Sequence, residues 1–133
     1  MRVRDGMTAV VVSVGPAHTL REAARSMTER GTGAALVIDE ESPVPRLITE
    51  RDLLNAIGSG IDPDQGLVGS HMSESVIAAS PEWSLERAAA EMSRRRIRHL
   101  VVYEEGELVG ILSMRDIVEV WTSDGATSDA DRV

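Results

Sequence analysis

The chain has 133 residues, a formal net charge of −8 at pH 7 and an estimated isoelectric point near 4.8. This length corresponds to one ordinary domain that can bury a sizeable core. An acidic surface argues against a general affinity for nucleic acid or anionic membranes, and we therefore predict neither as a partner. Cysteine is absent, which excludes disulfides, thiolate metal sites and cysteine nucleophiles.

The N-terminus gives no sign of a targeting segment. Residues 1–6 lack the apolar core of a signal peptide, and no apolar run approaches the length that spans a bilayer. We therefore expect a soluble protein with a cytoplasmic location.

The first half of the chain predicts a strand, a helix, two further strands and a second helix. The β-branched run at 9–12 is typical of a buried strand. Thr19 and Glu22 match a capping box, which predicts a helix that begins after Thr19 and ends near Gly31. The remaining elements are predicted at 34–38 (strand), 47–48 (strand) and 50–57 (helix).

The second half predicts the same elements in the same order. Ser84 takes the cap position of Thr19, although Arg87 replaces the glutamate, so the reciprocal half of the capping box is lost. The predicted strands lie at 76–79, 100–103 and 108–112, and the last helix ends near Trp121.

Two similar motifs indicate that the chain contains two versions of one unit. Residues 110–116 (GILSMRD) match residues 46–52 (RLITERD), with Ser113 and Thr49 standing 64 positions apart. Both units read β-α-β-β-α, which predicts an α+β layered fold. Residues 1–8 are expected to pack against the second unit. The predicted limits are 1–61 for the first repeat, 62–75 for a linker and lead-in, 76–121 for the second repeat, and 122–133 for a disordered tail.

In each copy, a hydroxyl at a strand end is followed three residues later by an aspartate at a predicted helix N-terminus. Such a terminus exposes unpaired N–H groups and the positive end of the helix dipole, so it attracts phosphate. A carboxylate suits the adjacent hydroxyls of a ribose, and a neighbouring arginine offers donors to phosphate. The same pattern is also a capping box, which many helices have for stability alone. The two candidate sets are Thr49, Arg51 and Asp52, and Ser113, Arg115 and Asp116.

The order of these motifs resembles the CBS domain family, named for cystathionine β-synthase. The chain is similar to the tandem pair, in which two repeats form one disc-like module with pseudo-twofold symmetry. The resemblance extends from about residue 7 to residue 121 and rests on the Ser80–Pro81 turn, the helix at 85–92, and the sequences at 96–102 and 110–116. Two departures stand out: Arg46 replaces the glycine usual in the family, which Gly110 retains, and Leu36 and Val101 occupy positions where the family often has proline.

The resemblance implies two ligand-binding clefts between the repeats, in a crossed arrangement. One cleft would combine Thr49, Arg51 and Asp52 with residues of the second repeat, namely Ile77, Ala78, Ile97, Arg98 and His99. The other would combine Ser113, Arg115 and Asp116 with residues of the first repeat, namely Val12, Ser13, Thr32 and Gly33. The first cleft is richer in cationic groups, so we expect it to hold phosphate better.

The only dense basic stretch is at 94–99. We interpret Arg94 and Arg95 as cations that complement a helix C-terminus. Arg98 and His99 lie beyond the predicted helix end and are candidates for phosphate contact, although His99 is equally compatible with a partly buried ring bonded to the backbone. The three histidines lack metal-ligand spacing and no nucleophile has an orienting partner, so we predict no catalytic residue, no metal and no enzyme activity.

The leading hypothesis is a stand-alone regulatory module that senses an adenosine-containing nucleotide, such as AMP, ADP or ATP, and requires no cofactor. Occupancy would be passed to a protein partner or a homodimer interface through differential affinity for two arrangements of the repeats. NAD and S-adenosylmethionine are other ligands that the family permits. The alternative is a structural dimerisation module with empty clefts, whose surface would be formed by Leu53, Leu54, Ile57, Ile117, Val118 and Trp121.

Overall fold

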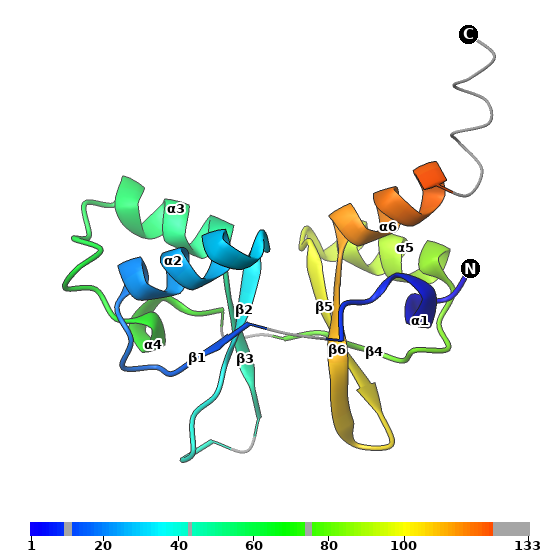
Figure 1. Ribbon diagram of the computed structural model, residues 1–133, viewed down its shortest axis with the longest axis horizontal. Helices are drawn as coiled ribbons and strands as arrows, with labels where there is room; N and C mark the ends of the chain where they lie inside the picture. Colours follow the sequence, from blue (N-terminus) through cyan, green and yellow to red (C-terminus); the bar gives the residue numbers. More distant parts are fainter. Residues whose placement is uncertain (10–11, 43, 74–75, 124–133) are drawn as a thin grey trace, which may run out of the picture. The chain divides into compact units, whose positions relative to one another are not determined.

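The computed structural model describes residues 1–9, 12–42, 44–73 and 76–123. The chain divides into two compact units, one comprising Val11–Val76 and the other Met1–Val10 with Ile77–Val133. Each unit holds one three-stranded sheet, with strand orders β1-β2-β3 and β4-β5-β6 (Figure 1). We refer to them as the β1–β3 unit and the β4–β6 unit. The predicted α+β class is confirmed.

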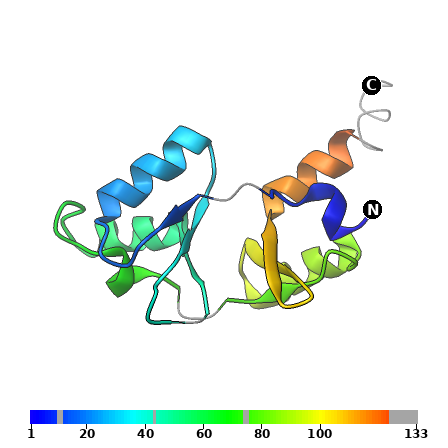
Figure 2. The same ribbon diagram turned by 60° about the horizontal axis from the view of Figure 1, so that its bottom comes forward.

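In the β1–β3 unit, the first strand runs parallel to the second, and the third returns antiparallel to it. The helices pack against each other and against the sheet (Figure 2). The elements are β1 (Ser13–Val14), α2 (Leu20–Arg30), β2 (Ala34–Val37), β3 (Arg46–Thr49), α3 (Glu50–Gly58) and α4 (Val68–His71). The buried core comprises Val14, Leu20, Ala23, Met27, Ala35, Val37, Ile48, Ala56 and Val68.

The β4–β6 unit has the same topology, with a longer hairpin between its last two strands. Its elements are α1 (Val3–Gly6), β4 (Ala78–Ala79), α5 (Leu85–Arg95), β5 (His99–Glu104), β6 (Glu107–Ser113) and α6 (Met114–Trp121). Its core comprises Val3, Ala79, Leu85, Ala88, Met92, Leu100, Val102, Leu112 and Ile117.

The predicted starts of α2 and α5 are confirmed. Thr19 and Glu22 form both halves of a capping box, whereas Ser84 accepts a hydrogen bond from the Arg87 N–H without a reciprocal acid. Gly31 ends α2 with a left-handed φ of 63°, which costs glycine no Cβ strain.

The sequence did not predict the short helices α1 and α4, which occupy equivalent places in the two repeats. Val3 and Val68 are 65 positions apart, and both side chains are fully buried. The helix that precedes the first repeat lies in the β4–β6 unit, and the helix that precedes the second repeat lies in the β1–β3 unit. The prediction that residues 1–8 pack against the second repeat is therefore confirmed.

Both first strands lie later than predicted. Leu36 N donates to Val12 O and the ladder continues at Ser13–Val14, so the strand at 9–12 was placed too early; residues 10 and 11 fall outside the described ranges. The strand predicted at 76–79 is reduced to β4 at Ala78–Ala79. A β-branched run indicates burial, but it does not indicate which backbone groups face a partner strand.

Gly110 has a steric role. A Cβ at this position would lie 2.6 Å from the Thr8 carbonyl oxygen, because the segment after α1 pairs with Ile111 there. Its counterpart Arg46 pairs with Val37 and is half-buried, so the β1–β3 unit accommodates a side chain at the equivalent place.

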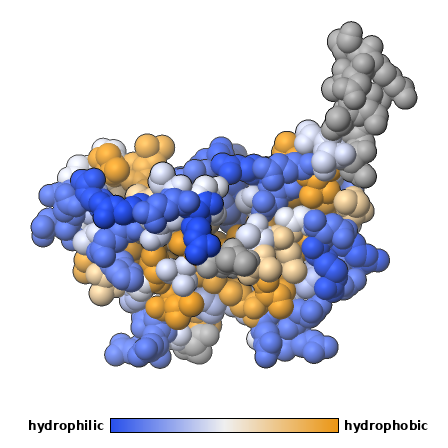
Figure 3. Space-filling model, viewed as in Figure 1, coloured by the Kyte–Doolittle hydropathy of each residue, from blue (hydrophilic) through white to orange (hydrophobic). Residues whose placement is uncertain are grey.

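The apolar residues predicted to form a dimer surface differ in how far their side chains are exposed. Leu54 and Ile57 on α3 are 71% and 57% exposed, and Val118 and Trp121 on α6 are 47% and 40% exposed. Figure 3 shows hydrophobic side chains at the surface over α3 and over α6. Ile117 is fully buried in the core, so its assignment to an exposed surface was wrong; its position on α6 turns it toward the sheet.

The tail predicted to be disordered begins with residues that are described. Thr122 donates its hydroxyl to the carbonyl oxygens of Val118 and Glu119 at the end of α6. Residues 124–133 lie outside the described part of the chain. Within that part, no helix is long and apolar enough to cross a membrane.

Candidate functional site

The first candidate set lies at the N-terminus of α3. Thr49 is the N-cap residue, and its hydroxyl oxygen accepts a hydrogen bond from the Asp52 N–H at 3.3 Å. The Asp52 carboxylate accepts in return from the Thr49 N–H at 2.8 Å and from the Thr49 hydroxyl at 3.0 Å. A third donor is the Ser73 hydroxyl, at 2.9 Å, from the segment that follows α4.

The second candidate set lies at the N-terminus of α6 and has the same geometry. Ser113 Oγ accepts from the Asp116 N–H at 3.0 Å, and Asp116 accepts from the Ser113 N–H at 2.8 Å. The hydroxyl and carboxylate three residues apart thus form a capping box in both repeats.

The capping interpretation is therefore confirmed, and the capping bonds use one oxygen of each carboxylate. The three hydrogen bonds to Asp52 all fall on Oδ2, and the bond from Ser113 N to Asp116 also falls on Oδ2. Oδ1 of each carboxylate takes no part in these bonds. A carboxylate has about four acceptor positions, so these capping bonds alone do not use all of them.

The remaining candidates of the β1–β3 unit gather at the same end of its sheet. Ala34 is the register partner of Thr49, and Glu50 N donates to Gly33 O at 2.9 Å, which places the start of β2 beside the start of α3. Leu36 N donates to Val12 O at 2.8 Å, which places the start of β1 at this end too. One sheet end thus holds Val12, Ser13, Thr32, Gly33, Thr49, Arg51 and Asp52.

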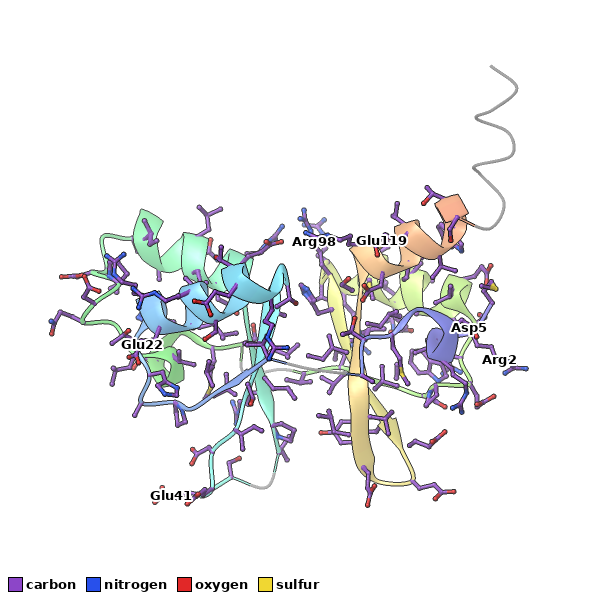
Figure 4. All side chains as sticks on the ribbon, in the orientation of Figure 1. Arg2, Asp5, Glu22, Glu41, Arg98 and Glu119 are labelled. Carbon is purple, nitrogen blue, oxygen red and sulfur yellow. The ribbon has the colours of Figure 1, made fainter. Side chains whose placement is uncertain are left out.

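The β4–β6 unit gathers its own candidates in the same way. His99 is the register partner of Ser113, Met114 N donates to Arg98 O at 2.9 Å, and Val101 N donates to Ile77 O at 3.0 Å. Figure 4 shows Arg98 at the end of the β4–β6 sheet where α6 begins. In the β1–β3 unit, Glu41 lies at the hairpin tip, at the end of the sheet away from the start of α3. The residues assembled here are Ile77, Ala78, Ile97, Arg98, His99, Ser113, Arg115 and Asp116. The predicted pairing of each helix set with a strand set of the other repeat stays a prediction.

The basic run separates into two kinds of residue. Arg94 and Arg95 form ion pairs with Glu91 at 2.8 and 3.0 Å, and the hydrogen bonds from these two guanidinium groups lower the pKa of Glu91. Arg96 ends α5 in the left-handed region, with a φ of 57°. Arg98 is exposed and His99 half-buried. Both lie beyond the end of α5, as predicted, and their contact with phosphate stays a prediction.

Two residues at the sheet ends were not predicted. Ser73 donates to Asp52, and no sequence motif marked it, because it lies in the lead-in and not in either motif. The Glu50 carboxylate covers Gly33, with its oxygens 3.1 and 3.3 Å from the position of a Cβ on that residue. Comparison of Glu50 with its counterpart Met114, 64 positions later, would have indicated a difference between the repeats.

In the described ranges, no cluster of three or more His, Asp or Glu side chains is arranged to hold a metal ion. The convergent groups at the sheet ends are instead acceptors, hydroxyls and arginines, which suit the binding of a polar ligand.

Comparison with known proteins decides the family. The model of the CBS domain matches residues 3–59 and 68–123, once for each repeat. The chain belongs to the CBS domain family. It is 34% identical over 116 residues to the CBS domain-containing protein YhcV of Bacillus subtilis, covering 86% of this chain and 81% of YhcV.

Further similar proteins include an uncharacterized relative and a solved CBS domain protein. An uncharacterized protein of Methanopyrus kandleri is 33% identical over 112 residues, and the match spans 83% of this chain but only 57% of that protein. A CBS domain protein of Pyrobaculum aerophilum, solved as a complex with AMP, is 30% identical with a TM-score of 0.77, covering 92% of this chain and 99% of that chain. The fold is therefore that of solved CBS pairs.

Proposed function

We propose that this CBS pair is a regulatory module that binds an adenosine-containing nucleotide, such as AMP, ADP or ATP, without catalysing a reaction. The observation that carries the proposal is that Asp52 and Asp116 each cap a helix through Oδ2, while Oδ1 takes no part in those bonds. The likeness to an AMP-bound CBS domain protein supports the ligand class.

The proposed roles follow from the chemistry of each group. Oδ1 of the aspartates accepts from ribose hydroxyls, and the arginines at the helix N-termini, together with Arg98, donate to phosphate. The apolar and small residues at the strand starts contact the adenine ring. Each site combines the helix set of one repeat with the strand set of the other, as the family resemblance implies.

Occupancy regulates by shifting an equilibrium. A nucleotide that prefers one arrangement of the repeats over another stabilises that arrangement by its difference in affinity, and a protein partner responds to the shift. NAD and S-adenosylmethionine are the competing ligands, and the cytoplasm is the proposed location.

Thermal denaturation with added nucleotide tests the proposal. A ligand at about 100 times its Kd that binds only the folded state contributes roughly 2.7 kcal/mol, which for a chain of this size corresponds to a rise in Tm of roughly 10 °C. We expect AMP, ADP or ATP to produce such a rise and GTP to produce none.

Substitution of the two aspartates identifies the site. The double variant Asp52→Ala, Asp116→Ala should lose the nucleotide-dependent rise in Tm. The matched control is Glu22→Ala, because Glu22 closes the capping box of α2 but lies outside both candidate sets. An unchanged rise in the double variant would refute the proposed site, and no rise with any adenosine compound in the unaltered protein would refute the function.

A structural dimerisation module is the second candidate. The exposed apolar side chains on α3 and α6 favour it, since burial of Leu54 and Trp121 against a second copy would remove hydrophobic surface from water. Sedimentation with and without AMP distinguishes the two functions. A homodimer whose stability and association are insensitive to every adenosine compound would favour the structural module.

A further inference from the structure

The carboxylate of Asp52 is held from two separate segments of the β1–β3 unit. Thr49 supplies two donors to Oδ2, its backbone N–H at 2.8 Å and its hydroxyl at 3.0 Å, and both belong to the capped turn itself. The Ser73 hydroxyl supplies a further donor to the same oxygen at 2.9 Å, from 21 residues away along the chain. This long-range bond is partly buried, so water competes with it less than it would at an exposed surface.

The backbone fixes where the Ser73 hydroxyl lies. Ser73 pairs with Leu47 on the edge of β3, and its N–H donates to the Leu47 carbonyl oxygen at 2.8 Å. The preceding residue, Met72, ends α4 by donating its N–H to Val68 O at 2.9 Å, and the Val68 side chain is fully buried in the core. Ser73 is therefore placed by an edge strand and by a short helix, and its hydroxyl is a well-positioned donor.

A second anchor matters because capping bonds alone define the orientation of a carboxylate poorly. The terminal torsion of an aspartate side chain is broad, so the plane of the carboxylate can turn while one oxygen stays bonded. Donors that reach Oδ2 from two segments restrict this rotation and thereby fix where Oδ1 points. A side chain that is already ordered loses less conformational freedom when a ligand binds, which raises affinity.

The equivalent place in the β4–β6 unit does not make this contact. Thr8 stands 65 positions before Ser73 and pairs with Ile111 on the edge of β6 in the same way. The Thr8 side chain is exposed, and within the described residues no hydrogen bond joins its hydroxyl to Asp116. The same backbone pairing thus gives the aspartate of one unit an extra donor and does not give one to the aspartate of the other.

We propose that Ser73 is a positioning residue for the ribose contact of Asp52. Its hydroxyl orients the carboxylate so that Oδ1 accepts from the ribose hydroxyls, whereas Asp116 contacts ribose without this support. This inference rests on the proposed function and adds to it a residue outside both candidate sets. It follows that Asp52 favours ribose over deoxyribose more strongly than Asp116 does.

Isothermal titration with AMP and with 2′,3′-dideoxy-AMP tests the role of Ser73. The Asp116→Ala protein keeps only the ribose contact of Asp52, and in it AMP should bind more tightly than the dideoxy analogue. Addition of Ser73→Ala should lower the affinity for AMP roughly three- to tenfold, which corresponds to ordering one side chain on binding. The affinity for the analogue should not change, because the analogue has no ribose hydroxyl to donate to Oδ1.

A conservative variant and a matched control separate positioning from stability. Ser73→Thr keeps a hydroxyl at the same backbone position, so the preference for AMP over the analogue should remain as in the Asp116→Ala protein. The matched control is Thr8→Val in the Asp52→Ala protein. It removes the equivalent hydroxyl at nearly constant side-chain size and should leave the preference of that protein unchanged.

Two results would overturn the assignment of Ser73. One is an equal loss of affinity for AMP and for the analogue in Ser73→Ala, which a purely structural role would produce, and the other is an unchanged affinity for both. In either case the Asp116→Ala protein would still prefer AMP, so the proposed function would stand. No preference for AMP in that protein, or no binding of AMP by the unaltered protein, would instead refute the proposed role of Asp52 and with it the proposed function.

Discussion

The β1–β3 unit and the β4–β6 unit carry different side chains where their sheets meet the helix N-termini. Both preserve the capping box that begins the last helix and the backbone hydrogen bond beside it. The side chains around that shared backbone are Gly33 and Glu50 in one unit, and Arg98 and Met114 in the other. The two aspartates have the same structural role because both cap helices, whereas the side chains beside them differ in charge between the units.

A second difference is the residue that each sheet places beside the segment preceding the repeats, which is Gly110 in one unit and Arg46 in the other. A substitution there gives the largest expected change in stability. Gly110→Ala places a Cβ 2.6 Å from the Thr8 carbonyl oxygen, so the backbone after α1 must move. Overpacking of this kind costs about 2–3 kcal/mol of unfolding free energy. Urea denaturation should show this loss in Gly110→Ala.

The matched control for this prediction is Arg46→Ala in the other repeat. Because Arg46 already carries a Cβ, its truncation should change the free energy of unfolding by only about 0.5 kcal/mol. Equal losses in both variants would show that the two lead-ins pack alike and would remove the difference between the units.

The aspartate caps give a smaller effect. Asp52→Ala removes the acceptor of the Thr49 N–H and also leaves the Ser73 hydroxyl without its partner, whereas Asp116→Ala removes the acceptor of the Ser113 N–H. We expect a loss of about 1 kcal/mol for Asp116→Ala and about 1–2 kcal/mol for Asp52→Ala.

Ser73→Ala separates the two contributions to the Asp52 result. In the Asp52→Ala background, it should cost less than it does in the unaltered protein, because its partner is already absent. A full additive loss would show that the hydrogen bond between Ser73 and Asp52 contributes nothing to stability.

The smallest expected effect is on stability at acid pH. It compares one exposed ion pair from each unit. A hydrogen bond from Arg4 lowers the pKa of Glu82 in the β4–β6 unit, and one from Arg21 lowers the pKa of Asp64 in the β1–β3 unit. A carboxyl whose folded pKa lies below its unfolded value stabilises the protein above the unfolded value. That contribution is lost as the pH falls through the folded pKa.

Removal of each arginine tests this dependence. In Arg4→Gln and in Arg21→Gln, the decline of Tm between about pH 5 and pH 3 should be slightly shallower than in the unaltered protein. Because all four side chains are largely exposed, the differences should shrink at high salt. A steeper decline in either variant would contradict the assigned direction.

The elements that follow local rules could be predicted from the sequence. Thr19, Ser84 and the hydroxyl and aspartate pairs mark helix starts by their own side-chain chemistry, and the structure places a cap at each of them. Met27 and Met92 recur at helical spacing and are buried in the two cores. These features depend on residues within one turn of each other.

The features that depend on distant residues could not be predicted. The first strands were placed too early because their limits are set by pairing with β2 and β5, and α1 and α4 were missed because four-residue helices carry no periodic pattern. Likewise, the steric role of Gly110 depends on Thr8, and the placement of Glu50 over Gly33 requires both strands of the sheet. The repeat alignment nevertheless singled out Gly110 and its counterpart Arg46.

The exchange of the lead-in helices bears on how such a chain can arise. Val3 completes a core whose other residues come from 79 onward, and Val68 completes a core formed by residues 14–56. A polypeptide with a single repeat would therefore carry a short helix that completes the core of a second copy and not its own core. Two such polypeptides would satisfy each other as an intertwined pair, and fusion of their genes would turn that mutual dependence into the present tandem order.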